Sequence, residues 1–143
     1  MTRTYVITGA ASGIGRATAE LLKERGQKVI GVDIHDADVT VDLTTAEGRA
    51  ELVKRVTELS GGTIDAIIAN AGLATPTAKT VAVNYFGAVA TLTGLRPLLA
   101  GSTAPRAVAT ASMASLFPAD EALLKALTAG DEAAALARGA ELE

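Results

Sequence analysis

Residues 8–15 read Thr8-Gly9-Ala10-Ala11-Ser12-Gly13-Ile14-Gly15, and this stretch lies between a predicted strand and a predicted helix. The preceding run, residues 4–8, is rich in the β-branched and aromatic residues that strands favour. Apolar residues recur at helical spacing from Ile14 to Leu22. A glycine-rich turn that opens a helix presents free backbone N–H groups and the positive end of the helix dipole, so it can bind the phosphates of a nucleotide. On the glycines alone, an ordinary β–α turn explains the stretch equally well.

Each glycine of this turn has its own steric role under the phosphate-binding hypothesis. Gly9 allows a tight turn after the strand, and Gly13 lets a diphosphate approach the backbone. Gly15 lets the helix pack closely on the sheet.

A carboxylate, Asp33, ends the next predicted strand, residues 28–33. At that place it can accept hydrogen bonds from the adenosine ribose hydroxyls, and it would repel a 2′-phosphate. The nearest candidate cation is His35, and Ser12 in the glycine turn is not basic. We therefore expect NAD as the cofactor in preference to NADP. The alternative is that Asp33 only caps a surface turn.

Strand and helix patterns alternate along the chain, which predicts an α/β fold. The expected architecture is a Rossmann-type doubly wound parallel sheet with helices on both faces. The five predicted strands are residues 4–8, 28–33, 39–42, 64–69 and 106–111, and the predicted helices start near residues 14, 44 and 78, the last reaching about residue 99.

Two details of this pattern stand out. Thr44 and Glu47 have the spacing of a capping box at the start of the second helix. Only residues 34–38 separate the second strand from the third, whereas parallel neighbours usually need a crossover of a dozen or more residues. The third strand is therefore either a short rung or wrongly bounded.

Composition narrows the class of protein. A chain of 143 residues fits one domain, residues 1–143, and contains no cysteine for a disulfide or a thiolate metal site. The net charge is −3 without a basic run, so we expect no nucleic-acid partner and no binding to a membrane surface. The first strand begins within a few residues of Met1, and polar residues interrupt the longest apolar stretch. We therefore expect neither a signal peptide nor a membrane span, and a cytoplasmic location.

The motifs Thr8-Gly9-x-x-x-Gly13-x-Gly15 and Asn70-Ala71-Gly72 together resemble the short-chain dehydrogenase/reductase family. Asn84 and Ser112 fall where that family keeps its catalytic Asn and Ser. Within the family, residues 31–38, 42–49 and 83–87 are similar to the bacterial 3α-hydroxysteroid dehydrogenase/carbonyl reductase branch.

The resemblance implies roles for particular residues. Asn84 would hold a water in the proton-relay path, and Ser112 would hydrogen-bond the substrate carbonyl or hydroxyl. The residues implied in cofactor binding are Thr8, Gly9, Ser12, Gly13, Ile14 and Gly15 at the turn, Asp33 at the ribose, Asp42 and Leu43 at the adenine, and Asn70, Ala71 and Gly72 beside the cofactor ribose. Two alternatives stay open: Asn84 can be satisfied within its own helix, and Ser112 can cap a loop.

The chain departs from the family pattern at the proton donor. The family uses a Tyr followed four residues later by a Lys, which lowers the tyrosine pKa from about 10 toward the working pH. The only tyrosines are Tyr5 and Tyr85, and the residues four further on are Gly9 and Val89. The sequence thus contains a cofactor site and half of a catalytic site.

The last segment, residues 119–143, is rich in Ala, Leu and Glu and is predicted to be helical. It resembles a helical insertion that separates the Ser from the Tyr in the hydroxysteroid dehydrogenase branch, so we expect the chain to be a truncated sequence that lacks the C-terminal part of the family fold. The alternative is a C-terminal amphipathic hairpin that covers the sheet. Under truncation, the fifth strand is an exposed edge, which favours association.

The leading hypothesis is an NAD(P)-dependent oxidoreductase that interconverts a secondary alcohol and a ketone by hydride transfer. The expected substrate is a small apolar carbonyl compound or alcohol such as a steroid, and assembly into a homo-oligomer is a further expectation from the family. The rival hypothesis is a non-catalytic NAD-binding or interaction module. We expect no metal, because His35, Asp36 and Asp38 form a pattern more typical of a solvated turn. Ser112 lacks the G-x-S-x-G elbow of a hydrolase, and the chain has no P-loop lysine motif.

Overall fold

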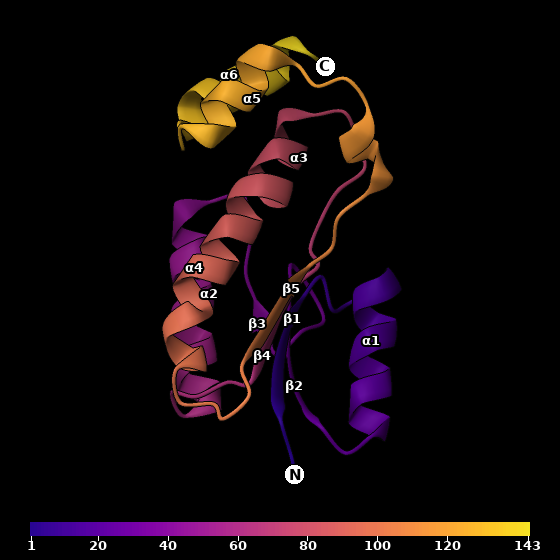
Figure 1. Cartoon of the computed structure of the whole chain (residues 1–143), viewed down its shortest axis with the longest axis vertical. Coiled ribbons are helices and arrows are strands. Elements are labelled where there is room, and N and C mark those ends of the chain that lie inside the picture. The colour runs from indigo at the N-terminus through magenta and orange to yellow at the C-terminus, as the bar shows by residue number, and fades with distance from the viewer.

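The computed structural model describes all residues from Met1 to Glu143, and its strands form one parallel sheet in the order β3-β2-β1-β4-β5 (Figure 1). The strands are β1 (Thr4–Thr8), β2 (Lys28–Asp33), β3 (Val39–Thr40), β4 (Ala66–Ala69) and β5 (Arg106–Ala109). A parallel sheet whose first strand lies at its centre is the Rossmann-type arrangement. The predicted α/β class and five-stranded parallel sheet are confirmed.

Helices cover both faces of this sheet (Figure 1). Helix α1 lies alone on one face, while α2 and α4 lie side by side on the other. The helical segments are α1 (Gly13–Glu24), α2 (Ala46–Ser60), α3 (Ala78–Val81), the π-helix η1 (Ala82–Gly87), α4 (Ala88–Leu99), the 3₁₀-helix η2 (Met113–Leu116), α5 (Glu121–Thr128) and α6 (Glu132–Glu141).

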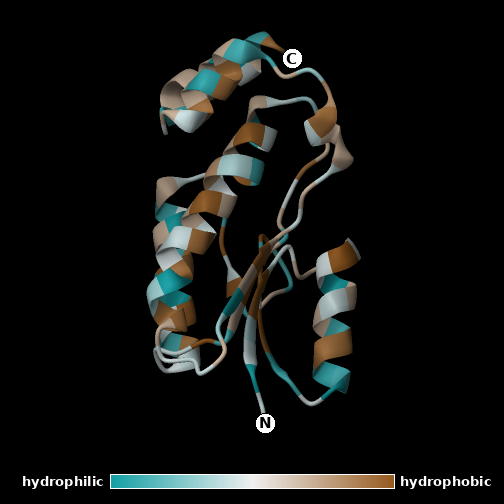
Figure 2. Ribbon diagram, viewed as in Figure 1, coloured by the Kyte–Doolittle hydropathy of each residue, from teal (hydrophilic) through white to brown (hydrophobic).

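The main hydrophobic core lies between the sheet and the pair α2 and α4. The central strands carry the hydrophobic residues that Figure 2 shows in brown at the middle of the sheet, as expected for strands buried on both faces. The buried members of the core are Val6, Ile30, Val32, Val39, Val41, Leu43, Leu52, Val56, Ile64, Ile67 and Leu95. By contrast, α1 buries only Gly15 and Ala19 fully.

The third strand is shorter than the predicted residues 39–42. Val39 and Thr40 pair in parallel with the last two residues of β2. No helix connects β2 to β3, because the loop folds back on itself: Asp36 adopts the left-handed region at φ 47° and Asp38 Oδ2 accepts a hydrogen bond from Gly31 N at 2.8 Å. The short-rung alternative is therefore correct.

The predicted capping box at Thr44 is wrong by one residue. Thr45 is the N-cap of α2, and its Oγ1 accepts a hydrogen bond from Gly48 N at 2.9 Å. Thr44 Oγ1 instead donates to Asp42 Oδ1 at 2.6 Å. Because the Thr44 hydroxyl is already bonded to Asp42 in the preceding turn, Thr45 caps the helix, one residue later than predicted. Strands β4 and β5 are likewise shorter than the predicted residues 64–69 and 106–111.

The predicted helix over residues 78–99 exists, but it contains a π-helical turn, η1, at residues 82–87. Such wide turns often lie at functional sites. Its glycines permit close packing: a Cβ on Gly87 would lie 3.2 Å from Leu43 Cβ, and one on Gly94 would lie 2.6 Å from Val53 Cγ2.

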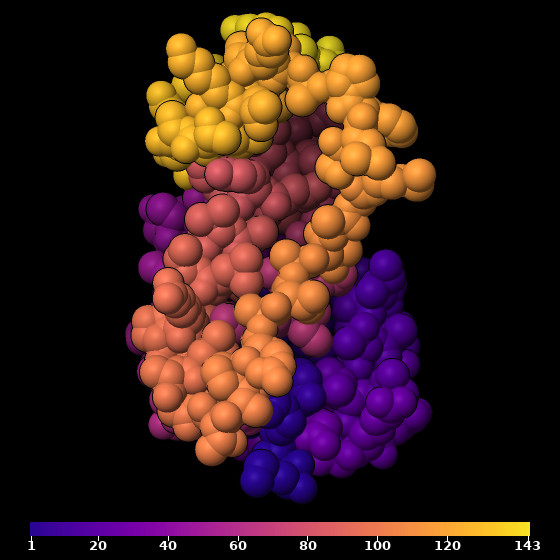
Figure 3. Space-filling view, in the orientation of Figure 1, coloured from indigo at the N-terminus to yellow at the C-terminus, as the bar shows by residue number.

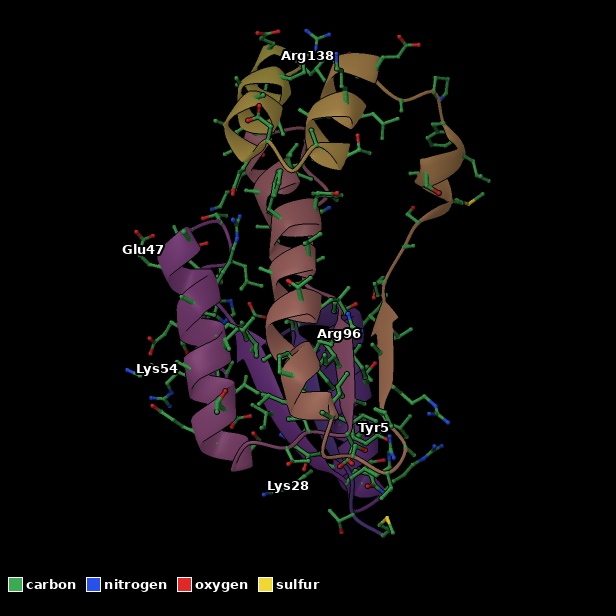
Figure 4. The ribbon with its side chains drawn as sticks, turned by 60° about the vertical axis from the view of Figure 1, so that its left-hand side comes forward. Tyr5, Lys28, Glu47, Lys54, Arg96 and Arg138 are labelled. Atoms are coloured by element: carbon green, nitrogen blue, oxygen red, sulfur yellow. The ribbon has the colours of Figure 1, made fainter.

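Residues 121–141 form a helical hairpin, α5–α6, that packs on α3 and η1 beyond the carboxyl ends of the strands (Figure 1). Ala126 and Ala135 pack on Phe86 of η1. Arg138, labelled in Figure 4, clamps the hairpin by donating to both carboxylate oxygens of Asp120 at 2.9 and 2.8 Å. The helices that the sequence predicts in residues 119–143 are confirmed.

Acid is expected to loosen the hairpin. The Arg138 guanidinium lowers the pKa of Asp120 from 3.8 to about 2. Because the folded-state pKa is lower than the unfolded one, the ion pair contributes stability above pH ~4 and loses that contribution as the pH falls toward ~2. Asp120→Asn is expected to lower the melting temperature at pH 6, and the difference from wild type should shrink as the pH falls through about 2 and vanish below that value. Glu121→Gln, which removes a carboxylate without hydrogen-bond partners from the same helix, serves as the control; an equal effect from it would contradict the ion-pair account.

Strand β5 is an exposed edge of the sheet. All four of its residues are exposed, and Val108 retains 57% of its surface. Figure 3 shows the orange segment that contains β5 and the residues after it lying across the face of the molecule with nothing over it. The predicted exposed edge is thus confirmed. None of the helices combines the length and the apolar character that crossing a bilayer requires.

Candidate functional site

A cleft of about 740 Å³ opens at the carboxyl ends of the strands, where open parallel sheets bind ligands. Six segments line it: the glycine turn, the end of β2, residues 41–44, residues 70–73, the helix that begins at α3, and Thr110 after β5. The structure brings most of the predicted cofactor residues to this cleft, namely Gly9, Ser12, Gly13, Ile14, Asp33, Asp42, Leu43, Asn70, Ala71 and Gly72.

The glycine turn has an open backbone on the cleft side. Gly9 and Gly13 have φ of 71° and 56°, and a Cβ on Gly13 would meet no atom within 4 Å. Ser12, the N-cap of α1, makes no capping bond with its side chain, and the first turn of α1 carries no acidic residue. The N–H groups at this helix end therefore stay available to an anion, so the turn fits a diphosphate.

Gly15 and Thr8 act behind the cleft rather than in it. A Cβ on Gly15 would overlap the carbonyl of Gly9, so the absence of a side chain lets α1 start directly against the turn. Thr8 is buried, and its Oγ1 accepts hydrogen bonds from Asn70 N at 3.0 Å and Ala71 N at 2.9 Å. Both were predicted to bind the cofactor; neither lines the cleft, because each is covered by the turn it supports.

The Asp33 carboxylate is fixed to the glycine turn. Its Oδ2 accepts a hydrogen bond from Ala11 N at 2.9 Å, and its Oδ1 accepts one from Ile34 N at 2.7 Å. A carboxylate oxygen has capacity for a second hydrogen bond, so both oxygens can still accept from a ligand in the cleft. The alternative of a simple cap accounts for the two backbone bonds but not for the position of Asp33 in the cleft wall.

Asp42 is a second carboxylate of the cleft. The hydroxyl and amide of Thr44 lower its pKa below the ordinary 3.8, and Lys79 and Arg49 add a smaller lowering. The group therefore stays ionised at neutral pH and can accept hydrogen bonds from a ligand.

Asn84 lies in the π-helix, and both ends of its amide bind the backbone of Leu73. Oδ1 accepts from Leu73 N at 2.8 Å, and Nδ2 donates to Leu73 O at 3.0 Å. The side chain is thus satisfied by the loop after β4 and not within its own helix. Asn84 fixes this loop beside the cleft, and its own side chain does not line the cleft.

Ser112 is exposed, and the structure does not bring it together with Asn84 at the cleft. Its Oγ accepts from Ala114 N at 3.1 Å and caps the short helix η2. This is the loop-capping alternative that the sequence left open. The catalytic roles of both residues stay predictions.

Nine of the residues that line the cleft were not predicted as site residues, among them Lys79, Val83 and Thr110. Thr110 follows β5 and its Oγ1 donates to Asn70 Oδ1 at 2.8 Å. The rule that ligands bind beyond the carboxyl ends of parallel strands could have found Thr110. No sequence signal marks Lys79. No three His, Cys, Asp or Glu side chains converge on a potential metal position.

Comparison with known proteins agrees with this geometry. Residues 3–123 match the short chain dehydrogenase family. The chain belongs to the short chain dehydrogenase family. The resemblance inferred from the glycine turn and Asn70-Ala71-Gly72 is therefore correct.

Individual relatives of the family narrow the branch. The chain is 40% identical over 137 residues to the 3-alpha-hydroxysteroid dehydrogenase/carbonyl reductase of Comamonas testosteroni, a match that covers 92% of this chain and 53% of the relative. It superposes with a TM-score of 0.91 and 41% identity on the 3-alpha-hydroxysteroid dehydrogenase of Pseudomonas sp. B-0831 in complex with NADH, covering 95% of this chain and 56% of that one. A cis-4-hydroxycyclohexanecarboxylate dehydrogenase of Sinomonas cyclohexanicum is 41% identical over 92 residues, 53% of this chain and 36% of the relative. The chain spans about half the length of the first two of these short chain dehydrogenases.

Proposed function

We propose that the cleft binds NAD(H) and that the protein is an oxidoreductase that interconverts a secondary alcohol and a ketone. One observation carries the proposal: the Asp33 carboxylate is hydrogen-bonded to a glycine turn whose backbone stays open at Gly13. A carboxylate and a free helix N-terminus side by side match the ribose and the diphosphate of a dinucleotide.

Different residues of the cleft bind different parts of the cofactor. Under the proposal, Gly13 and the first amides of α1 hold the diphosphate, and Asp33 accepts from the adenosine ribose. Asp42 and Leu43 flank the adenine, and residues 70–72 flank the second ribose. When bound, NAD supplies the hydride acceptor for alcohol oxidation. The proposed roles of Asn84 and Ser112 are to hold a relay water and to bind the substrate oxygen.

The names of the relatives support an apolar substrate. Two of them are 3-alpha-hydroxysteroid dehydrogenases, and a third oxidises a hydroxycyclohexanecarboxylate by its name. We propose a cyclic secondary alcohol or the matching ketone, with a steroid as the first compound to test.

Asp33→Ala is expected to narrow the preference for NADH over NADPH by about tenfold or more. The substitution removes hydrogen bonds from a charged acceptor to the ribose, which weakens NADH binding, and it removes repulsion of the 2′-phosphate. Calorimetric titration of wild type and variant with both cofactors measures the change.

Asp36→Asn is the matched control. It removes a carboxylate from the neighbouring loop, and asparagine tolerates the left-handed backbone of that position. This variant should keep the wild-type preference. Equal affinities of the wild-type protein for NADH and NADPH would refute the role of Asp33.

A further inference from the structure

Arg49, in the first turn of α2, donates hydrogen bonds to three other segments of the chain. Its Nε donates to the carbonyl of Leu43 at 2.8 Å, and its Nη2 donates to the carbonyl of Ala82 at 3.2 Å. Its Nη1 donates to Oε2 of Glu132 at 2.8 Å. Only 12% of the Arg49 side chain is exposed. A planar guanidinium can reach three acceptors in different directions, whereas a lysine ammonium cannot reproduce that fork.

Two of these acceptors belong to neighbouring walls of the cleft. Leu43 lines the cleft in the loop after β3, and Ala82 begins the π-helix whose next residue, Val83, also lines the cleft. Both acceptors are main-chain carbonyls, so Arg49 fixes the backbone rather than a side chain. The two walls also approach closely, since a Cβ on Gly87 would lie 3.2 Å from Leu43 Cβ.

The third acceptor links this junction to the hairpin α5–α6. Glu132, in the first turn of α6, is 34% exposed and supplies the counter-charge for a guanidinium that is nearly removed from water. The Arg49 guanidinium carbon also lies 5.9 Å from the centre of the Phe86 ring, against which the hairpin packs. A partly buried cation needs such a partner, because a buried charge without a counter-charge destabilises the fold.

We propose that Arg49 is a positioning residue of the cofactor site: it sets the separation of the Leu43 and Val83 walls that receive the adenine, and Glu132 of the hairpin holds it in place. The inference rests on the proposed NAD(H) binding and assigns the hairpin a part in it. Arg49 does not line the cleft, so it acts on the ligand without contact, through the backbone of these two walls and through the charge it places near Asp42.

Titration of the 143-residue chain with NADH and with 5′-AMP tests the inference. Arg49→Met is expected to lower the affinity for both ligands by a similar factor, about tenfold, because both contain the adenosine that the two walls receive. Arg49→Lys should bind with intermediate affinity, since it keeps the charge but reaches fewer carbonyls. Glu132→Gln should lower the affinity for NADH about threefold when it is the single substitution. In the Arg49→Met background it should have no effect, because the two residues act as a pair.

The control is Arg138→Met, which breaks the other clamp of the hairpin away from the cleft. It should lower the melting temperature and leave both affinities unchanged, a result that separates positioning from general stability. All titrations are made at a temperature where circular dichroism shows each variant folded. If Arg49→Met does not fold, Arg49→Lys and Glu132→Gln decide the question. Wild-type affinity in these folded variants would overturn the inference, whereas a wild-type protein that binds neither ligand would instead refute the proposed function.

Discussion

Gly15→Ala is expected to lower the melting temperature by about 10 °C and to abolish measurable NADH binding. The new Cβ would overlap the carbonyl carbon and oxygen of Gly9. These two atoms cannot move away from it without displacing the turn or α1. Overpacking against backbone costs about 3 kcal/mol or more, which is a large part of the stability of a domain of this size. The turn would shift in the variant, and with it the amides proposed to hold the diphosphate.

Two glycine variants control this prediction. In Gly94→Ala the Cβ meets Val53 Cγ2, the end of a side chain that can rotate, and alanine gains about 1 kcal/mol of helix propensity. Its melting temperature should stay within a few degrees of wild type. In Gly13→Ala the Cβ meets nothing, so stability should fall only by the ~1 kcal/mol of the left-handed backbone, while the methyl group should weaken NADH binding. A Gly15→Ala protein as stable as Gly94→Ala would contradict the close packing of α1 against the glycine turn.

Alcohol oxidation by the 143-residue chain is expected to be slower than that of the Comamonas testosteroni relative by about 10²- to 10⁴-fold. Positioned general acid/base catalysis contributes a factor of this size, and neither tyrosine can supply it here. Figure 4 shows Tyr5 toward the end of the sheet opposite the hairpin, and its ring lies 5.8 Å from the Arg3 guanidinium. Tyr85 packs edge-on against Phe86 with the ring centres 5.1 Å apart.

The two proteins are compared by kcat/KM for one 3α-hydroxysteroid in the same assay, together with NADH binding on the same samples. Binding without turnover agrees with a cofactor site that lacks its proton donor. Turnover within tenfold of the relative would show that another group of the cleft transfers the proton. Lys79→Met would then test one candidate, since Lys79 is a titratable side chain that lines the cleft.

The sequence predicted those parts of the site that depend on local structure. The glycine turn follows from a strand, three glycines and a helix in one short stretch, and Asp33 follows from the end of the adjacent strand. Gly15 is an example: its position in the sequence predicts close packing of the helix on the sheet, and in the structure it lies against the Gly9 carbonyl of the turn that follows β1. Such features survive because strand, turn and helix fix one another within a few residues.

The sequence predicted less well where distant segments decide the geometry. Thr44 and Thr45 are equally good caps by composition, and only the hydrogen bond from Thr44 to Asp42 assigns the cap to Thr45. The Leu73 backbone binds the Asn84 amide across the loop after β4, a contact that no helical pattern reveals. The junction at Arg49 likewise depends on residues far apart in the chain, so its charge pattern alone gave no sign of it.

Nuclear magnetic resonance tests the central claim, that the cleft at the glycine turn is the NAD(H) site, most directly. A 14.4 kDa chain gives resolved backbone amide signals that can be followed during a titration with NADH. The account predicts saturable shifts at the amides of Gly13, Leu43 and Ala71, and none at Gly130 in the hairpin turn. Saturable shifts confined to other parts of the molecule, or no shifts at millimolar NADH, would contradict it.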